Sequence, residues 1–409
     1  MTTTKNNEHK KLNVPNLRFP EFQGEWEKHE LNDICETITD FVAAGSFASL
    51  RENVTYYQED NYAQLVRTID LKNNFSNNEF VYVDKGAYDF LWRVQLIEPN
   101  IVLPNIGANI GEKYYVRPQN LPKDKNVLGP NAILLRSESN DTHFVYFRLS
   151  TSSYDNEMKK LIGASGQPKF NKTDLKKVKV FMPTISEQKK ISRFLALIDE
   201  RIATQNKIIE DLKKLKSAII EKLYKEIQGT WYSYRQLFSI INERNKQLEY
   251  SNVLSASQER GMVSREDLNL DIHFERSNIS TYKIVKNGDY VIHLRSFQGG
   301  FAFSEKTGIC SPAYTVLRPN NLLVYGYLSN YFTSRDFVKS LIIVTYGIRD
   351  GRSINVDEWL DMKVVIPSKE QQTHIVNVIE SIENKIKNEE TYSNCLLNQK
   401  QYLLRQMFI

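Results

Sequence analysis

One stretch of this chain occurs twice, and this repeat constrains the fold more than any other feature of the sequence. The first copy begins at Pro183 as Pro-Thr-Ile-Ser-Glu-Gln-Lys-Lys-Ile, and the second begins 184 positions later as Pro-Ser-Lys-Glu-Gln-Gln-Thr-His-Ile. In each copy a hydroxyl residue is followed three positions later by Glu or Gln, as in Thr184 with Glu187 and Ser368 with Gln371. This spacing is typical of a capping box at a helix N-terminus.

Both copies continue as amphipathic helices with the same seam. Apolar residues recur in steps of four and three, at Ile191, Leu195, Ile198, Ile202, Ile209, Leu212, Ile219 and Leu223, and in the copy at Ile375, Ile379, Ile382, Ile386, Leu396, Leu403 and Met407. So narrow a seam suits one partner helix. The polar interruptions repeat as well, since Gln205 aligns with Glu389 and Lys216 with Lys400. Polar seam residues usually fix helix register, so we expect two helices matched to each other. The alternative is two unrelated amphipathic helices on separate cores.

The segments before the two helices are more distant copies of each other. The matches are Gly24-Glu-Trp26 with Gly229-Thr-Trp231, Ile101–Gly111 with Tyr290–Gly300, Leu135-Arg136 with Leu317-Arg318, Gly163 with Gly347, Asn171 with Asn355, and Lys179-Val180 with Lys363-Val364. Short alternating β-rich runs and turn residues indicate mixed folds for these segments, which we call the heads. The predicted order is therefore head, helix, head, helix.

This order predicts an α/β (α+β) fold with two globular domains separated by two long helices, paired as an antiparallel coiled coil with a pseudo-twofold internal repeat. A head between the helices lets the second helix return along the first. About 40 residues at 1.5 Å per residue give a helix of roughly 60 Å. Such a pair would measure the distance between two binding heads, and duplex DNA, whose half-sites recur about every 34–36 Å, is the ligand that fits this best.

The composition agrees with a globular protein that has anionic partners. The chain has 409 residues, 41% apolar and 25% charged, with a net charge of +5. A polar N-terminus without a signal-peptide core leads us to expect a cytoplasmic protein. The three cysteines (Cys35, Cys310 and Cys395) and the six histidines show no metal-ligand spacing, and we expect no metal site. No phosphate-binding or dinucleotide-binding glycine loop occurs.

Three segments together resemble the specificity subunit of bacterial type I restriction–modification systems. They are Leu17-Arg-Phe-Pro-Glu-Phe-Gln-Gly-Glu-Trp26, Gly163-Ala-Ser-Gly-Gln-Pro-Lys-Phe-Asn171, and the helix start from Pro183 to Ile191 with Glu187-Gln188. The resemblance covers essentially the whole chain. One departure is Gln371-Gln372, where the family pattern has Glu-Gln; Glu370-Gln371 restores it by a slip of one residue, which leaves the start of the second helix open.

The resemblance implies a non-catalytic subunit that recognises a bipartite asymmetric DNA target. It implies an N-terminal arm (1–25), target-recognition domains at 26–182 and 229–366, and spacer helices at 183–228 and 367–409. The implied partners are double-stranded DNA, two modification (methyltransferase) subunits and restriction (translocase and nuclease) subunits, with no membrane. Adenine methylation and DNA cleavage would belong to those partners, which would bring S-adenosylmethionine, ATP and Mg²⁺; no cofactor is expected in this chain.

Candidate DNA-binding side chains lie in glycine-punctuated loops. They are Asn105, Asn109, Gln167 and Lys169 in the first head, and Arg295, Ser296, Gln298, Arg349 and Arg352 in the second. Arg, Lys, Gln and Asn are the side chains that bridge base edges and bind phosphates. The alternative for each loop is an exposed structural turn. Two other functions also stay open, namely a scaffold whose heads bind proteins and a DNA-modifying enzyme whose site is not visible in the sequence.

Overall fold

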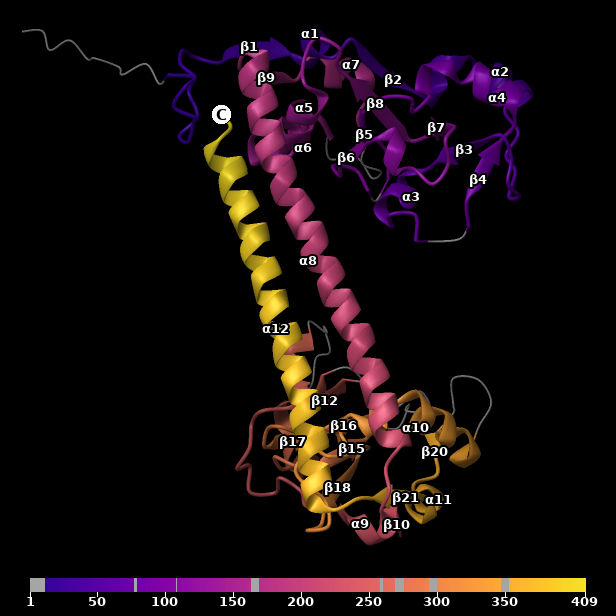
Figure 1. Cartoon of the computed structure of the whole chain (residues 1–409), viewed down its shortest axis with the longest axis vertical. Helices are drawn as coiled ribbons and strands as arrows, with labels where there is room; N and C mark the ends of the chain where they lie inside the picture. The colour runs from indigo at the N-terminus through magenta and orange to yellow at the C-terminus, as the bar shows by residue number, and fades with distance from the viewer. Residues whose placement is uncertain are drawn as a thin grey trace, which may run out of the picture. The chain divides into compact units, whose positions relative to one another are not determined.

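The computed structural model describes residues 12–76, 79–107, 109–162, 169–257, 260–268, 276–293, 300–346 and 353–409. The chain forms two compact units. Unit 1 comprises Met1–Thr204 with Ser393–Ile409, and unit 2 comprises Gln205–Tyr392. The two long helices, α8 (Ile185–Lys225) and α12 (Lys369–Gln406), each contribute one part to each unit (Figure 1).

Unit 1 combines a four-stranded sheet, a three-stranded sheet and short helices. Its strands are β1 (Glu27–Glu30), β2 (Thr37–Asp40), β3 (Ala63–Val66), β4 (Val81–Val83), β5 (Asn100–Pro104), β6 (Tyr114–Val116), β7 (Asn126–Leu128), β8 (Ala132–Arg136) and β9 (Lys179–Met182). Its helices before α8 are α1 (Leu31–Ile34), α2 (Phe47–Asn53), α3 (Thr68–Lys72), α4 (Lys85–Phe90), α5 (Thr142–Leu149), α6 (Ser152–Ile162) and α7 (Lys172–Lys176). The four-stranded sheet has the order β2-β8-β5-β6, the three-stranded sheet the order β4-β3-β7, and β1 pairs with β9.

Unit 2 repeats the four-stranded sheet with other additions. Its strands are β10 (Thr230–Ser233), β11 (Phe238–Ile241), β12 (Leu254–Ser257), β13 (Gly261–Ser264), β14 (Lys283–Val285), β15 (Tyr290–Ile292), β16 (Phe301–Phe303), β17 (Gly308–Cys310), β18 (Thr315–Pro319), β19 (Thr345–Tyr346), β20 (Ser353–Ile354) and β21 (Lys363–Ile366). Its short helices are α9 (Tyr234–Leu237), α10 (Arg335–Ser340) and α11 (Val356–Asp361). The sheet order β11-β18-β15-β16 matches that of unit 1, and the remaining strands form pairs.

The central sheets are buried on both faces in both units. Along β5, Ile101 and Leu103 join the core that contains the helix seam, whereas Val102 joins the core shared with the three-stranded sheet. Along β15, Tyr290 and Val291 likewise enter two different cores. Because successive side chains of a strand point to opposite faces, each sheet separates two hydrophobic layers.

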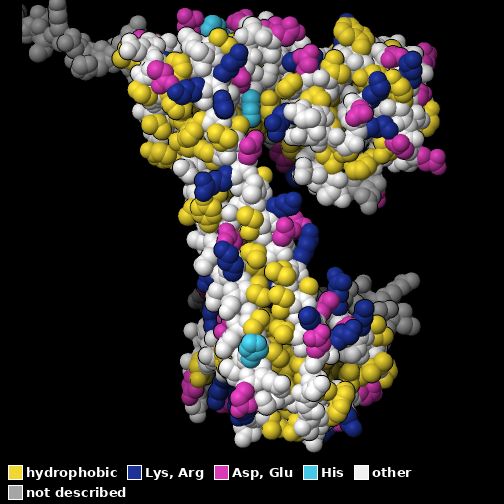
Figure 2. All heavy atoms as spheres, viewed as in Figure 1, with side chains coloured by type: hydrophobic (Ala, Val, Ile, Leu, Met, Phe, Trp, Pro, Cys, Tyr) yellow, Lys and Arg dark blue, Asp and Glu magenta, His cyan; other side chains and the backbone are white. Residues whose placement is uncertain are grey.

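The two long helices pack against each other in opposite directions within each unit. In unit 1 the start of α8, with Ile191 and Leu195, shares a core with the end of α12, with Leu403 and Met407. The last turns of α12, drawn in yellow, accordingly lie beside the first turns of α8 (Figure 1). In unit 2 the end of α8 packs on the start of α12, and hydrophobic side chains gather along that seam (Figure 2). The antiparallel pair predicted from the sequence is therefore confirmed.

Each polar residue that interrupts the seam has a polar or charged partner on the other long helix. In unit 2 the Gln205 Nε2 donates to the backbone oxygen of Glu389 at 3.2 Å and also to its carboxylate. Lys216 forms an ion pair with Glu383 at 2.6 Å. In unit 1 Lys400 pairs with Asp199 at 2.5 Å, and these two positions are the 184-residue counterparts of Lys216 and Glu383. The polar seam positions thus obey the same internal symmetry as the apolar ones.

An N-terminal arm covers the helix pair in unit 1. The Arg18 guanidinium donates to both carboxylate oxygens of Glu187, at 2.8 and 2.7 Å, and Glu187 is buried. The Phe19 ring packs edge-on against Phe194, and the backbone N–H of Leu17 donates to Gln406 at the end of α12. This aromatic segment therefore packs against the helix pair of unit 1.

The corresponding place in unit 2 is an open groove. Gln371 and His374, the counterparts of Glu187 and Lys190, are both exposed. They line a cavity of about 290 Å³ together with Leu223, Glu226, Ile227, Gln228, Pro367 and Ile375. The repeat is therefore symmetric in its long helices and four-stranded sheets, whereas the arm covers the helix pair of unit 1.

One sequence match is wrong by two residues. β1 pairs with β9 so that Glu27 lies opposite Met182, and β10 pairs with β21 so that Thr230 lies opposite Ile366. Glu27 therefore corresponds to Thr230, and the tryptophans of the Gly-x-Trp segments are not equivalent. Trp26 is buried at 2% exposure, whereas Trp231 is 65% exposed.

Candidate nucleic-acid interface

In each unit, candidate residues follow an equivalent strand of the four-stranded sheet. Ile101 lies opposite Leu135 in unit 1, and Tyr290 lies opposite Leu317 in unit 2. The sequence matches of Ile101 with Tyr290 and of Leu135 with Leu317 are therefore confirmed. β5 and β15 are therefore equivalent strands, and the segments that follow them in sequence carry several of the candidate residues.

The arginines that follow Leu135 and Leu317 stabilise the sheets. Arg318 donates to both carboxylate oxygens of Asp289, at 2.9 and 2.8 Å, and this bond raises the pKa of its guanidinium. Arg136 donates from Nε to Asn100 at 2.9 Å. Asn100 and Asp289 are equivalent positions at the start of β5 and just before β15, so both arginines brace an internal contact of the sheet.

In unit 1 the structure joins two of the candidate loops. The Asn105 side-chain amide donates to the backbone oxygen of Phe170 at 3.3 Å, and the Phe170 N–H donates back to the Asn105 backbone oxygen at 3.2 Å. Ile106 forms an isolated antiparallel bridge with Lys169. The loop between β5 and β6 and the segment before α7 thus form one surface, on which Lys169 is exposed.

Asn109 lies in the same loop and is held by a lysine that the sequence reasoning missed. The Lys72 Nζ donates to the Asn109 side-chain oxygen at 2.9 Å and pairs with Glu112 at 2.7 Å. Lys72 belongs to the last turn of α3, far from this loop in sequence. No local motif links the two, so only the tertiary fold identifies Lys72 as part of this surface. Glycines at 107 and 111 have φ of +92° and +91°, which favour glycine in both turns.

The other candidate residues lie outside the described part of the chain. These are Gln167, Arg295, Ser296, Gln298, Arg349 and Arg352. The structure does describe the strands β19 and β20, which flank the segment with Arg349 and Arg352. The pairing of β19 with β20 sets Thr345 opposite Ile354 and Tyr346 opposite Ser353, so residues 347–352 connect the two strands of a hairpin.

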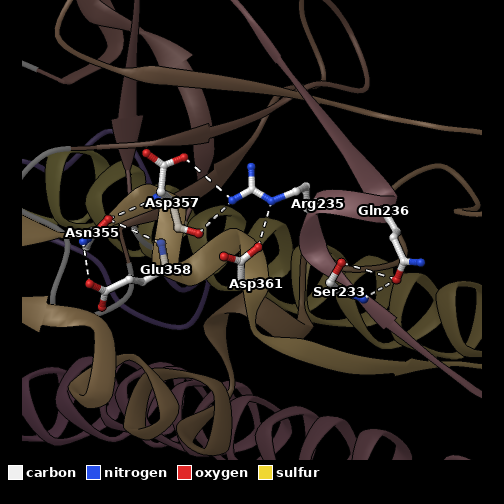
Figure 3. A network of polar contacts seen from close by, with 7 residues as sticks. All are labelled: Ser233, Arg235, Gln236, Asn355, Asp357, Glu358 and Asp361. Atoms are coloured by element: carbon white, nitrogen blue, oxygen red, sulfur yellow. Dashed lines mark hydrogen bonds and ion pairs between the residues drawn. The ribbon is translucent and has the colours of Figure 1, made fainter.

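The base of this hairpin is tied to the rest of unit 2 by a polar network (Figure 3). Directly after β20, the Asn355 side-chain oxygen accepts from the backbone N–H of Glu358 at 3.3 Å and caps α11. Arg235 donates from Nε to Asp361 at the end of α11, at 2.8 Å, and also to the backbone oxygen of Asp357 in the first turn of α11, at 3.2 Å. Tyr346 on β19 donates to Glu358 at 2.7 Å. The frame of the candidate loop is therefore anchored at several points.

The equivalent frame in unit 1 uses the same cap. The Asn171 side-chain oxygen accepts from the backbone N–H of Asp174 at 2.9 Å at the start of α7. Asn171 and Asn355 therefore have the same role, as their sequence match predicts. In both units a candidate loop leads directly into a capped short helix.

A cleft beside β6 adds an aromatic and charged surface in unit 1. It has a volume of about 380 Å³ and is lined by residues in or next to α3, β6, α5 and α8, including Asn74, Phe75, Lys113, Arg117, Tyr146 and Glu200. His143 stacks on Tyr115 with ring centroids 4.0 Å apart, and burial lowers its pKa to about 4. Aromatic faces next to Lys and Arg suit stacking and phosphate contacts with a nucleic acid.

Within the described ranges, no cluster of His, Cys, Asp and Glu could hold a metal ion. Over the same residues, no helix combines the length and the apolar character that a membrane span needs.

Comparison with known proteins agrees with this architecture. Residues 23–214 match the family model of the type I restriction modification DNA specificity domain. The chain is 23% identical to the type I restriction enzyme MjaX specificity subunit of Methanocaldococcus jannaschii, over 92% of this chain and 91% of that protein.

Two solved structures have the same fold. One is the S subunit of a type I restriction-modification system from M. genitalium, with a TM-score of 0.53, 14% identity, and 97% of this chain and 99% of that one covered. The other is described as showing the structural basis of complex assembly and conformational transition of the type I R-M system. Its TM-score is 0.57 at 12% identity, and the match covers 94% of this chain and 97% of that one. In sequence over residues 23–214 and in fold over nearly the whole chain, the protein resembles the specificity subunits of type I restriction–modification systems.

Proposed function

We propose that this chain is the DNA sequence-recognition subunit of a type I restriction–modification complex and that each head reads one half of a bipartite, asymmetric target. One observation carries the proposal. Two heads share a sheet of the same strand order, yet they differ in the strands and loops built around it. A common frame with different loops is what two readers of different half-sites require, because base readout depends on the side chains that reach the grooves.

Within each head we assign the reading surface to the loops that the frame presents. In unit 1 this surface combines the β5–β6 loop, Lys72 and Lys169. In unit 2 we assign the reading to the segment that follows β15 and to the segment between β19 and β20. Lysine and arginine at such a surface position the duplex through phosphates, while Asn, Gln and Arg can form paired hydrogen bonds with base edges.

We assign catalysis to the partner subunits. Two modification subunits would bind S-adenosylmethionine and methylate adenine, and restriction subunits would use ATP and Mg²⁺ to translocate and cleave DNA. The similarity of the chain to specificity subunits supports this division of tasks. The chain itself would supply the target and the geometry on which its partners act.

DNA binding by the chain assembled with its modification subunits tests the proposal. A duplex that carries the methylated motif of the host genome should bind far more tightly than a scrambled duplex, with an affinity that falls linearly on a log–log plot against salt concentration. Equal, salt-insensitive affinity for both duplexes would contradict the proposal and favour a scaffold that binds proteins. Methylation or cleavage by the isolated chain would instead favour an enzyme.

A further inference from the structure

Two buried glutamines hold the same position at the starts of the two long helices. Gln188 in α8 and Gln372 in α12 are 184 residues apart and are only 2% and 1% exposed. Few surrounding residues are shared between the heads, so two identical buried side chains call for a common physical reason.

Each glutamine makes the same set of hydrogen bonds in its own unit. The Gln188 Nε2 donates to the backbone oxygen of Pro183 at 2.9 Å and to the Asn140 side-chain oxygen at 2.9 Å. Its Oε1 accepts from the backbone N–H of Asp141 at 3.0 Å.

Gln372 repeats this arrangement with backbone partners. Its Nε2 donates to the backbone oxygens of Pro367 and Leu322, both at 3.0 Å, and its Oε1 accepts from the Val324 N–H at 2.8 Å. Both amides therefore use two donors and one acceptor. This equivalence also settles the start of the second helix, since Gln372, and not Gln371, is the counterpart of Gln188.

The partners of both glutamines follow the central strand of the sheet. Asn140 and Asp141 come after β8, and Leu322 and Val324 come after β18. β8 and β18 neighbour β5 and β15, the strands that lead into the candidate loops. Apolar packing between helix and head has little directionality, whereas three hydrogen bonds to one planar amide define an orientation.

We infer that Gln188 and Gln372 are positioning residues that fix the orientation of each head on its helix, and that each one thereby controls the reading of its own half-site. The inference rests on the proposed function, because it concerns how the heads read DNA. The glutamines would not touch DNA themselves. They would hold the strands that carry the reading loops.

The test uses Gln188→Met and Gln372→Met, which keep nearly the same volume and remove only the hydrogen bonds. The exposed neighbour Gln371→Met serves as the control. Each variant is assembled with the modification subunits, and its affinity is measured for the cognate duplex and for duplexes mismatched in one half-site. For Gln188→Met we expect discrimination to fall roughly tenfold at the half-site of unit 1 and to stay unchanged at the other, the size of one lost base contact. Gln372→Met should give the reciprocal result.

Thermal unfolding of the same complexes separates positioning from stability. A variant that unfolds earlier but keeps full discrimination at both half-sites would overturn the inference, and so would an equal loss at both. If Gln188→Met does not assemble, Asn140→Leu removes one partner of the amide and should weaken the same half-site. Absence of any sequence preference in the unmodified complex would refute the proposed function itself, independently of the variants.

Discussion

At the scale of residues, the most informative difference between the repeats is Glu187 against Gln371. Glu187 is buried beneath the arm and depends on Arg18 for its charge balance, whereas Gln371 is exposed beside a groove that has no arm. The capping pattern in the sequence gives both positions the same role. Only the tertiary contact with the arm, 169 residues away in sequence, separates them.

This pair leads to a stability prediction. Arg18→Met should destabilise the chain by about 3 kcal/mol, because it leaves a buried carboxylate without its partner. Adding Glu187→Gln, the residue type found in the second repeat, should recover most of that loss. Urea unfolding of the full chain measures both effects. A single variant as stable as the unmodified chain would mean that the arm is held by its aromatic contacts alone.

His143 predicts an acid-sensitive contribution to stability. Burial lowers its pKa to about 4, with Arg117 and Lys400 acting in the same direction and Asp141 opposing them. In the unfolded chain the group takes up a proton below about pH 6.5, so the folded state loses stability as the pH falls from about 6.5 to about 4. The loss should amount to about 1–3 kcal/mol, since the ring keeps some contact with solvent. His143→Phe, which can retain the stack on Tyr115, should flatten this part of the curve of unfolding free energy against pH; an unchanged slope would assign it to other groups.

The candidate loop of the second head gives a binding prediction from the sequence alone. In the assembled complex, replacing Arg349 or Arg352 by Ala should cost roughly 1–3 kcal/mol and relax one base of one half-site if the side chain reads a base. If it binds phosphate, all duplexes should weaken alike and the salt slope should fall by about one. Affinities for cognate and single-mismatch duplexes at several salt concentrations distinguish the two. Unchanged values for both variants would make the loop a structural turn.

At the scale of elements, the helices could be predicted from sequence and the heads only in part. The 184-residue shift places Gln205 on Glu389 and Lys216 on Lys400, and the structure shows the first two bonded and the two lysines in equivalent ion pairs. Short strands are harder, because a shift of two residues leaves the same face of a strand buried. The false match of Trp26 with Trp231 arose because the Gly-x-Trp motif recurs two residues out of register, with one tryptophan buried and the other exposed.

The remaining parts of the site depended on contacts that no local pattern encodes. Lys72 reaches Asn109 from α3. Gln188 accepts a hydrogen bond from the backbone of Asp141, which follows β8 and is 47 residues away in sequence. The loop glycines and the match of Asn171 with Asn355 could be found in the sequence because they are local patterns, whereas the helix caps that these asparagines form appear only in the structure. Long-range partners were not visible, because a single sequence records no distances.

The division of the helices between the units leads to a paired-insertion prediction. Seven residues inserted after Ile202 in α8 alone should destabilise the chain, because α12 then cannot keep its seam in both units. A second heptad after Tyr392 in α12 should restore stability, since each unit keeps its own helix contacts. The added length is about 10 Å, roughly three base-pair steps. When the paired variant is assembled with the modification subunits, the complex should methylate unchanged half-sites separated by a longer gap. An unchanged gap at full affinity would show that the helices do not set the spacing.

At the scale of the whole molecule, the chain contains one structural module twice, with different additions in each copy. The sheets, their strand order, the capped helices after the loops and the buried glutamines recur in both units. The three-stranded sheet belongs to unit 1, and the strand pairs β12-β13 and β14-β17 belong to unit 2. The elements common to both units therefore form the scaffold, and we expect the elements that differ to determine which bases each head recognises.

Exchange of one head tests this central claim most directly. Residues 231–362 are replaced by the matching segment of a related specificity subunit, with both long helices unchanged, and the methylated adenines are mapped in cells that express the chimera with its modification subunits. The account predicts a new second half-site, an unchanged first half-site and an unchanged gap between them. A motif altered in both halves, with the complex still assembled, would contradict independent reading by the two heads.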